Sequence, residues 1–175
     1  MTMRQFYDWQ TAGGGGDVSL LVATLERLEL AWCMIGGLAV NHWATEPMAT
    51  ADVDVVIAAE QIEPAVKALV AAGFKARKHK WSVNLTGRSK VSVQISTEKV
   101  YHEFPGRSVP ADIHGILMRV ASLPDTLAGK LLAYRDPERR ASKRQKDLTD
   151  ILRLVEAHPK LQKLLPADVV KKLNG

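Results

Sequence analysis

The stretch "MIGGLAVNHWATEPMATADVDVVI", from Met34 to Ile57, decides the fold prediction. The glycines Gly36 and Gly37 end a short apolar run, and Asp52 and Asp54 open another one. In a β-strand the side chains of residues i and i+2 share one face, with their α-carbons about 6.6 Å apart. Two carboxylates this close repel each other, and at least one pKa rises unless a cation neutralises them. The pattern therefore predicts a strand that carries a cation site.

A divalent metal suits this pair of aspartates. Mg²⁺ prefers oxygen ligands, binds through one or two protein carboxylates, and completes its shell with water and substrate phosphates. A Gly-Gly turn that opens a helix offers backbone N–H groups to an anion nearby. The alternative is an ordinary tight turn at Gly36, with Asp52 and Asp54 on a solvent-facing sheet edge, where charges discourage aggregation.

The hydrophobic periodicity predicts a mixed α/β (α+β) fold with a small mixed β-sheet and a helical C-terminal portion. Asp17 reads as the N-cap of a first helix, and Gly73 as the left-handed residue after another. We expect a polar loop from about Glu98 to Ile113 and only helices beyond it. The expected strands are 31–35, 52–58, 74–79, 81–87 and 90–97, and the expected helices are 18–30, 38–44, 61–73, 124–136, 139–157 and 161–173.

Length and composition favour one compact domain, because the chain has 175 residues of which 46% are hydrophobic. We expect a flexible segment at 1–16, because of the glycines from Gly13 to Gly16, and a single domain at 17–175. Its sheet part would span about 17–113 and its helical part about 114–175. The net charge of +5 favours a polyanionic partner. The lone Cys33 and the absence of a long apolar run predict a cytoplasmic protein without membrane contact.

The arrangement of Gly36, Gly37, Asp52 and Asp54 resembles the signature of the polymerase β-like nucleotidyltransferase superfamily. The downstream "LAGKLLAYRDPERRASKRQKDLTDIL", together with Thr50, resembles more specifically the AbiEii-type nucleotidyltransferases, the toxin halves of bacterial toxin–antitoxin systems. This resemblance extends roughly from Leu28 to Val155. It implies a nucleotidyltransferase fold, in which helices flank the small mixed sheet.

The resemblance also implies a reaction and a set of site residues. A nucleoside monophosphate would pass from a nucleoside triphosphate to a nucleic acid, with tRNA among the candidates, or to a protein, and an antitoxin would be a partner. Asp52 and Asp54 would be the catalytic pair and hold Mg²⁺ or Mn²⁺. The residues implied at the nucleotide and its phosphates are Gly36, Gly37, Thr50, Lys130 and Asp147.

Each helical site residue also has an ordinary interpretation. Lys130 would be a solvated lysine on an amphipathic helix, and Asp150 part of a solvated charged face. Asp147 would pair locally with Lys143 or Arg144. The basic cluster, residues 135–146, would contact an RNA backbone or simply keep the helix soluble.

One position departs from the superfamily pattern. The resemblance implies a third carboxylate on the strand "KVSVQIST", where this chain has Gln94. An amide can ligate a metal through its oxygen, but it carries no charge and accepts no proton. Glu98 and Glu103 are the acids that would substitute for it. Without a substitute, the chain would be a weak enzyme or a catalytically silent binding module with a nucleotidyltransferase fold.

Overall fold

The computed structural model describes residues 14–50, 52–113 and 115–173. Seven strands form one mixed sheet in the order β3-β4-β5-β2-β1-β7-β6. Among the described residues the strands are β1 (Trp32–Ile35), β2 (Asp52–Ile57), β3 (Lys75–Lys78), β4 (Ser82–Thr86), β5 (Ser92–Ser96), β6 (Val109–Ile113) and β7 (Ile116–Val120). The α-helices are α2 (Gly15–Arg27), α3 (Gly36–Trp43), α4 (Ile62–Ala71), α5 (Leu123–Arg135), α6 (Ala141–Ala157) and α7 (Ala167–Leu173).

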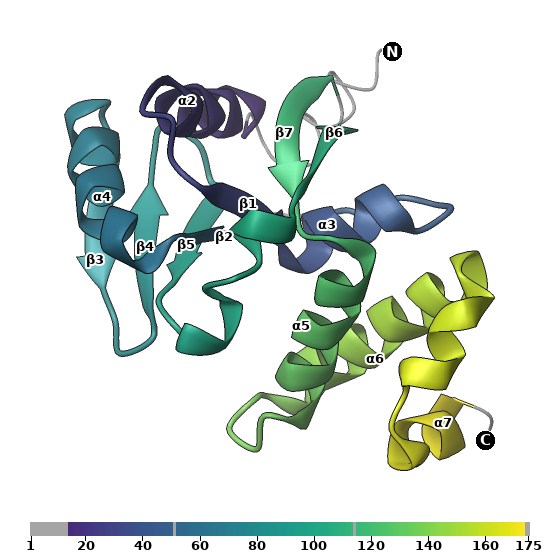
Figure 1. Ribbon diagram of the computed structural model, residues 1–175. Coiled ribbons are helices and arrows are strands. Elements are labelled where there is room, and N and C mark those ends of the chain that lie inside the picture. The colour runs from purple at the N-terminus through teal and green to yellow at the C-terminus, as the bar shows by residue number, and fades with distance from the viewer. Residues whose placement is uncertain (1–13, 51, 114, 174–175) are drawn as a thin grey trace.

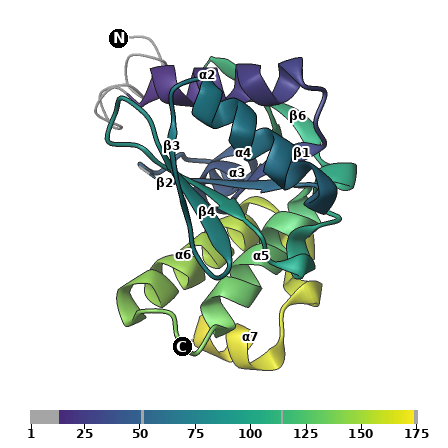
Figure 2. The ribbon, with the colours of Figure 1, turned by 90° about the vertical axis from the view of Figure 1, so that its left-hand side faces the viewer.

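The sheet lies between two groups of helices. Figure 2 shows α2 and α4 on one side of the sheet and α5, α6 and α7 on the other. In Figure 1 the yellow-green C-terminal helices lie apart from β3 and β4, at the opposite end of the molecule. The helical C-terminal portion thus covers one side of the β2 and β1 region, and none of the described helices covers the β3 end of that side.

The main core lies between the sheet and the helices α2 and α4. It contains Leu21 and Leu25 of α2, Leu69 of α4, and strand residues such as Val53 and Val93. The leucines recur at helical spacing, so one face of each helix is apolar and packs on the sheet. Burial of these side chains contributes about 25 cal/mol per Å² of apolar surface, which fixes the helices on this side.

The sequence suggested that Asp17 caps the first helix, but in the structure Asp17 lies within the first turn of α2. The helix begins at Gly15, and the Asp17 carboxylate accepts hydrogen bonds from the backbone N–H groups of Arg88 and Ser89 and from the Ser89 hydroxyl. Burial alone would raise the pKa of Asp17, but these hydrogen bonds outweigh it and lower the pKa. Asp17 therefore ties the first helix to the turn between β4 and β5.

A second core joins the C-terminal helices. Val40 of α3 packs with Leu127 of α5 and with Ile151 and Leu154 of α6. Because Leu38 and Ala39 of the same short helix belong to the main core, α3 contacts both halves of the molecule. This places the beginning of α3 at the junction between the sheet and the helical layer.

Two expectations about the chain's organisation need correction. The stretch predicted as a polar loop ends in β6, which pairs antiparallel with β7, so strands continue to Val120. The predicted flexible segment lies outside the described residues up to residue 13, but Gly15 and Gly16 are already helical. Strands 32–35, 52–57, 75–78, 82–86 and 92–96 and the left-handed Gly73 were predicted correctly. None of the described helices is long and apolar enough to cross a membrane.

Candidate active site

The two aspartates lie on the central strand of the sheet. β2 pairs antiparallel with β1 and parallel with β5, with Asp54 opposite Ile35 on one side and Gln94 on the other. Val53 between them is fully buried in the main core, so Asp52 and Asp54 face the other side, toward the C-terminal helices. The interpretation of these residues as charges on a sheet edge is therefore wrong.

The glycine pair lies directly beside this carboxylate pair. α3 begins at Gly36, whose φ of 64° is in the left-handed region that favours glycine. A Cβ atom on Gly36 would overlap the Asp54 carboxylate, and one on Gly37 would lie 3.1 Å from the Thr50 hydroxyl oxygen. The Thr50 hydroxyl donates a hydrogen bond to the Asp52 carbonyl at 3.2 Å. Only glycine allows the backbone at the start of α3 to approach the aspartates this closely.

The environment of Asp54 disfavours a bare negative charge. Desolvation, followed by the charge of Asp52, raises the pKa of Asp54 above its ordinary value. Lys130, Arg139 and Lys143 act in the opposite direction, but they do not cancel the shift. A further cation at this carboxylate would therefore be favourable.

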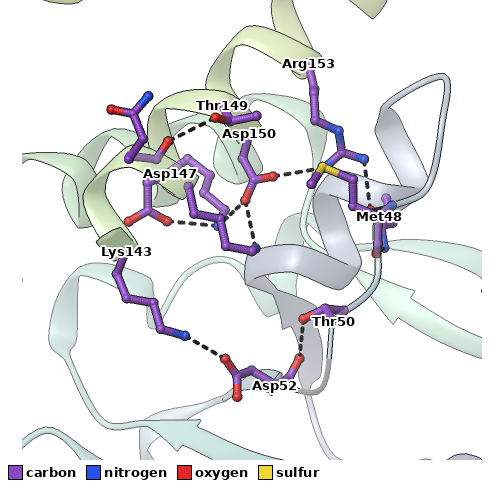
Figure 3. A network of polar contacts seen from close by, with 12 residues as sticks. Met48, Thr50, Asp52, Lys143, Asp147, Thr149, Asp150 and Arg153 are labelled. Carbon is purple, nitrogen blue, oxygen red and sulfur yellow. Dashed lines mark hydrogen bonds and ion pairs between the residues drawn. The ribbon is translucent and has the colours of Figure 1, made fainter. Parts of the chain in front are cut away.

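A lysine from the helical layer already contacts the other aspartate. Lys143 Nζ on α6 donates to Asp52 Oδ2 at 3.0 Å, across 91 residues of sequence. Figure 3 shows the lysine extended from α6 to Asp52, below Asp147 and Asp150 of the same helix. Both side chains of this ion pair are solvent-accessible, at 40% and 53%, so it is exchangeable and contributes little to stability.

Lys130 is buried between two aspartates of α6. Its Nζ lies 3.1 Å from Asp147 Oδ1 and 2.7 Å from Asp150 Oδ2, and both carboxylates are 1% exposed. The interpretations of Lys130 and Asp150 as solvated residues are therefore wrong, as is the local pairing of Asp147 with Lys143 or Arg144. Asp147 instead accepts from Arg139, and Asp150 from Arg153 at 2.9 Å.

This network fixes the charge of Asp150. Burial alone would raise the pKa of Asp150, but Lys130, Lys146 and Arg153 together lower it. Most residues of the basic cluster also make contacts within the chain. For example, Arg135 pairs with Asp168, and Arg144 donates a hydrogen bond to the Tyr134 carbonyl. Most of its charges are thus engaged within the chain.

These residues surround one cavity of about 360 Å³ between the sheet and the helical layer. The sequence-predicted residues that line it are Gly36, Asp52, Asp54, Lys130 and Asp147. Gly37 and Thr50 are not among the lining residues, but they lie next to each other beside the cavity. The cavity also brings Arg139 and Lys143 opposite the aspartates, so anionic and cationic groups face each other across it.

The third carboxylate is absent from the expected place. Gln94 lines the cavity beside Asp54, and the described residues contain no group of three or more Asp, Glu, His or Cys side chains arranged to hold a metal. Glu98 also lines the cavity, whereas Glu103 pairs with Arg107 at 3.1 Å. Of the two acids proposed as substitutes, only Glu98 is in position.

Among the residues of the cavity wall that sequence reasoning missed are Asp125 and Tyr101. Ser122 caps α5 by accepting a hydrogen bond from the Asp125 N–H, and the Asp125 carboxylate accepts two hydrogen bonds from the Arg107 guanidinium at 2.9 and 3.0 Å. Tyr101 is buried, and burial followed by the charge of Glu98 raises the pKa of Tyr101 to about 12. The Ser122-x-x-Asp125 capping pattern was a detectable signal, whereas Tyr101 lies in the stretch expected to be a loop.

A mixed sheet with two aspartates on its central strand, a glycine pair beside them and a cationic helical layer opposite defines a nucleotidyltransferase. Comparison with protein families agrees with this class. The chain belongs to the family described as nucleotidyl transferase AbiEii toxin, of type IV toxin–antitoxin systems, whose model matches residues 19–173. The predicted family and fold are thereby confirmed.

Solved structures of low sequence identity share the fold. ANT(2")-Ia in complex with adenylyl-2"-tobramycin superimposes with a TM-score of 0.60 at 15% identity, over 89% of this chain and 91% of that one. A putative nucleotidyltransferase from H. pylori gives a TM-score of 0.58 at 16% identity, over 93% and 74%. An antigenic nucleotidyltransferase-like protein from Paracoccidioides brasiliensis gives 0.55 at 20% identity, over 81% and 74%. The search among curated proteins found no match.

Proposed function

We propose that this chain moves a nucleoside monophosphate from a nucleoside triphosphate to a nucleic-acid or protein acceptor, with Mg²⁺ or Mn²⁺ bound by Asp52 and Asp54. One observation carries the proposal: the two carboxylates and the cations of α5 and α6 face each other across a cavity. Phosphoryl transfer mainly requires positioning of the reactants and neutralisation of charge. This arrangement supplies both.

The two aspartates fit a divalent cation. They share one face of β2, the pKa of Asp54 is raised, and Asp52 already has a cation, Lys143, as its partner. A hard cation with one or two protein carboxylates and phosphate oxygens as ligands matches this donor set. When bound, such a metal supplies charge neutralisation to the triphosphate and to the reacting oxygen.

The cationic residues then have different roles. Lys143 is accessible and bound only to Asp52 among the described residues, so it is free to contact the triphosphate once another cation takes that carboxylate. Lys130 is held by two buried aspartates, so its contacts support a role in positioning α5 against α6. Its assignment, and that of Asp147, to the phosphates stays a prediction. Gly36 and Gly37 present backbone N–H groups at the start of α3.

The bond changes follow from the donor and acceptor chemistry. The acceptor hydroxyl oxygen bonds to the α-phosphorus, the bond from that phosphorus to the β-phosphate oxygen breaks, and pyrophosphate leaves. The hydroxyl proton needs an acceptor, and Gln94 cannot serve. We assign this role to Glu98, because it is the acid among the two substitutes that lines the same cavity. Glu98→Gln should lower kcat by about 10²- to 10⁴-fold.

A catalytically silent binding module is the second candidate, and Gln94 is the observation that favours it. The two proposals differ in what Gln94→Asp does. If the natural protein is inactive and this substitution creates transfer activity, the chain is a binding module that lost its third carboxylate. If the natural protein is active and depends on Glu98, the transferase proposal holds.

Label transfer tests the main proposal directly. Each of four α-labelled nucleoside triphosphates is incubated with Mg²⁺ or Mn²⁺, total RNA and the protein. We expect label on RNA or on protein, and none with the variant Asp52→Asn, Asp54→Asn. A folded wild-type protein that transfers no label to either acceptor contradicts the proposal.

Family membership further supports a toxin that acts in the cytoplasm, where nucleoside triphosphates are available, and that is neutralised by an antitoxin protein. Induced expression of the wild-type chain should arrest growth, and the double aspartate variant should not. Equal growth arrest by both would show that any toxicity is independent of transfer.

A further inference from the structure

The sheet face that carries Asp52 and Asp54 extends beyond the cavity to the free edge at β3. Residues that pair across neighbouring strands share a face, so the strand register defines rows of side chains on this face. One row runs from Asp52 through Ser92 and Thr86 to Lys75. The next runs from Asp54 through Gln94 and Asn84 to Arg77. Both rows thus connect a site carboxylate to a cation.

This part of the face is open and polar. The side chains between the two ends of each row are uncharged and accessible or half-buried. The alternate residues, such as Val83 and Leu85 of β4, are buried in the main core on the opposite face. Figure 2 shows the helices α2 and α4 on that opposite side. The rows therefore form a polar strip that leads out of the cavity and that no other part of the described chain covers.

The two cations at the end of the strip have no acidic partner among residues 14–50, 52–113 and 115–173. Lys75 and Arg77 are exposed and form none of the ion pairs found there. Lys78 of the same strand points to the other face and pairs with Glu63 of α4. Three strand spacings of about 4.8 Å put Lys75 and Arg77 about 14 Å from the aspartates. That distance exceeds the Debye length of about 8 Å at physiological salt, so these cations do not neutralise the aspartates.

We propose that a single-stranded nucleic acid lies across this strip, with backbone phosphates at Lys75 and Arg77 and its reactive end at Asp52 and Asp54. Charge complementarity and the continuity of the rows with the cavity carry the proposal. The uncharged amides and hydroxyls between the two ends suit sugar and base edges. The role of this nucleic acid as the acceptor of the nucleotide rests on the proposed function. Its binding to the strip does not.

The test measures binding without nucleotide or divalent metal. The probes are fluorescein-labelled single-stranded RNA and DNA oligonucleotides of mixed sequence, titrated by fluorescence anisotropy over a range of salt concentrations. The variant Lys75→Gln, Arg77→Gln removes two phosphate contacts. Its control, Lys160→Gln, Lys163→Gln, makes the same charge change at two exposed lysines of the 3₁₀ segment Pro159–Leu164.

Loss of two phosphate contacts with a single strand makes the plot of log K against log salt less steep by about 1.4. When the variant and the wild type bind equally at 1 M salt, this difference makes the variant bind about 25-fold more weakly than the wild type at 0.1 M salt. We expect this loss for both oligonucleotides in the Lys75, Arg77 variant and no more than a twofold loss in the control. Equal losses in the two variants, or no loss in the first, overturn the proposal.

Sedimentation of the free protein tests the other occupant of a sheet edge. Self-association that the Lys75, Arg77 variant abolishes, without oligonucleotide binding by the wild type, would make β3 a protein interface and overturn the nucleic-acid track. A protein that binds oligonucleotides through Lys75 and Arg77 but transfers no label refutes only the proposed function.

Discussion

Replacing Lys130 by methionine should destabilise the fold strongly, because this substitution leaves two buried carboxylates without their shared cation. Lys130 Nζ lies 3.1 Å from Asp147 and 2.7 Å from Asp150, and both carboxylates are 1% exposed. Removal of one partner of a buried ion pair costs about 3–5 kcal/mol. Arg139 still neutralises Asp147, and Arg153 still neutralises Asp150, so we expect a loss near the lower end, about 3 kcal/mol.

Urea denaturation at pH 7 measures this loss. The pKa of Asp150 is lowered in the folded protein, so its charge stabilises the fold above the unfolded pKa of about 3.9, and this contribution is lost as the pH falls through the folded value. The difference between wild type and Lys130→Met should therefore shrink below about pH 4. The double variant Lys130→Met, Asp150→Asn should recover part of the stability.

A loss below about 1 kcal/mol would refute this reasoning, because a surface lysine typically contributes no more than that. It would return Lys130 to a role at the triphosphate. An unchanged free energy of unfolding together with a lost affinity for nucleotide would be the clearest form of that result.

Three further substitutions test the neighbourhood of the aspartates. Gly36→Ala should abolish activity and destabilise the fold by about 1–2 kcal/mol, because its Cβ meets Asp54 at a left-handed φ; activity and urea unfolding check both effects. Asp54→Asn should raise the Tm at pH 7, because the raised pKa of Asp54 means that its charge disfavours the fold above pH 3.9, and the gain should vanish below about pH 4. An unchanged or lower Tm at pH 7 contradicts this. Lys143→Met should tighten Mg²⁺ binding up to about fivefold, because an exposed ion pair contributes up to about 1 kcal/mol. Calorimetry without nucleotide measures this affinity. Weaker Mg²⁺ binding would mean that Lys143 does not compete for Asp52.

The shared face of Asp52 and Asp54 was predicted correctly, because the D-x-D pattern with an apolar residue between has one structural outcome in a half-covered strand. Val53 must enter the core, and its two neighbours must then share the opposite face. Gly36 was predictable as the tight turn that opens α3, because its left-handed backbone favours glycine. The face of each element was therefore accessible from the residues themselves.

The β6–β7 hairpin was missed because its first strand carries a residue that usually breaks strands. β6 contains Pro110, which has no N–H to donate, and the turn includes Gly115. Proline is tolerated here because β6 is the last strand in the sheet order, and an edge strand leaves some N–H positions unpaired. The pattern of Val109–Ile113 thus reads as a loop until the edge position is known.

The burial and pairing of Lys130 and Asp150 could not be predicted from the sequence either. Helical periodicity shows which residues share a face, but not which charged face is buried against a neighbouring helix. That depends on how α5 packs on α6, where Lys130 inserts between two aspartates. Charged residues in a polar pattern look solvated until the packing is known.

The ion pair between Asp52 and Lys143 has a consequence for the newly made chain. Its two residues are separated by 91 positions, so at about 5–20 residues per second the ribosome makes the carboxylate roughly 5 to 18 seconds before the lysine. Strands β1 to β5 can emerge in that interval, but α6 cannot. During synthesis the sheet therefore presents its aspartates before the opposing helix is available to pair with them.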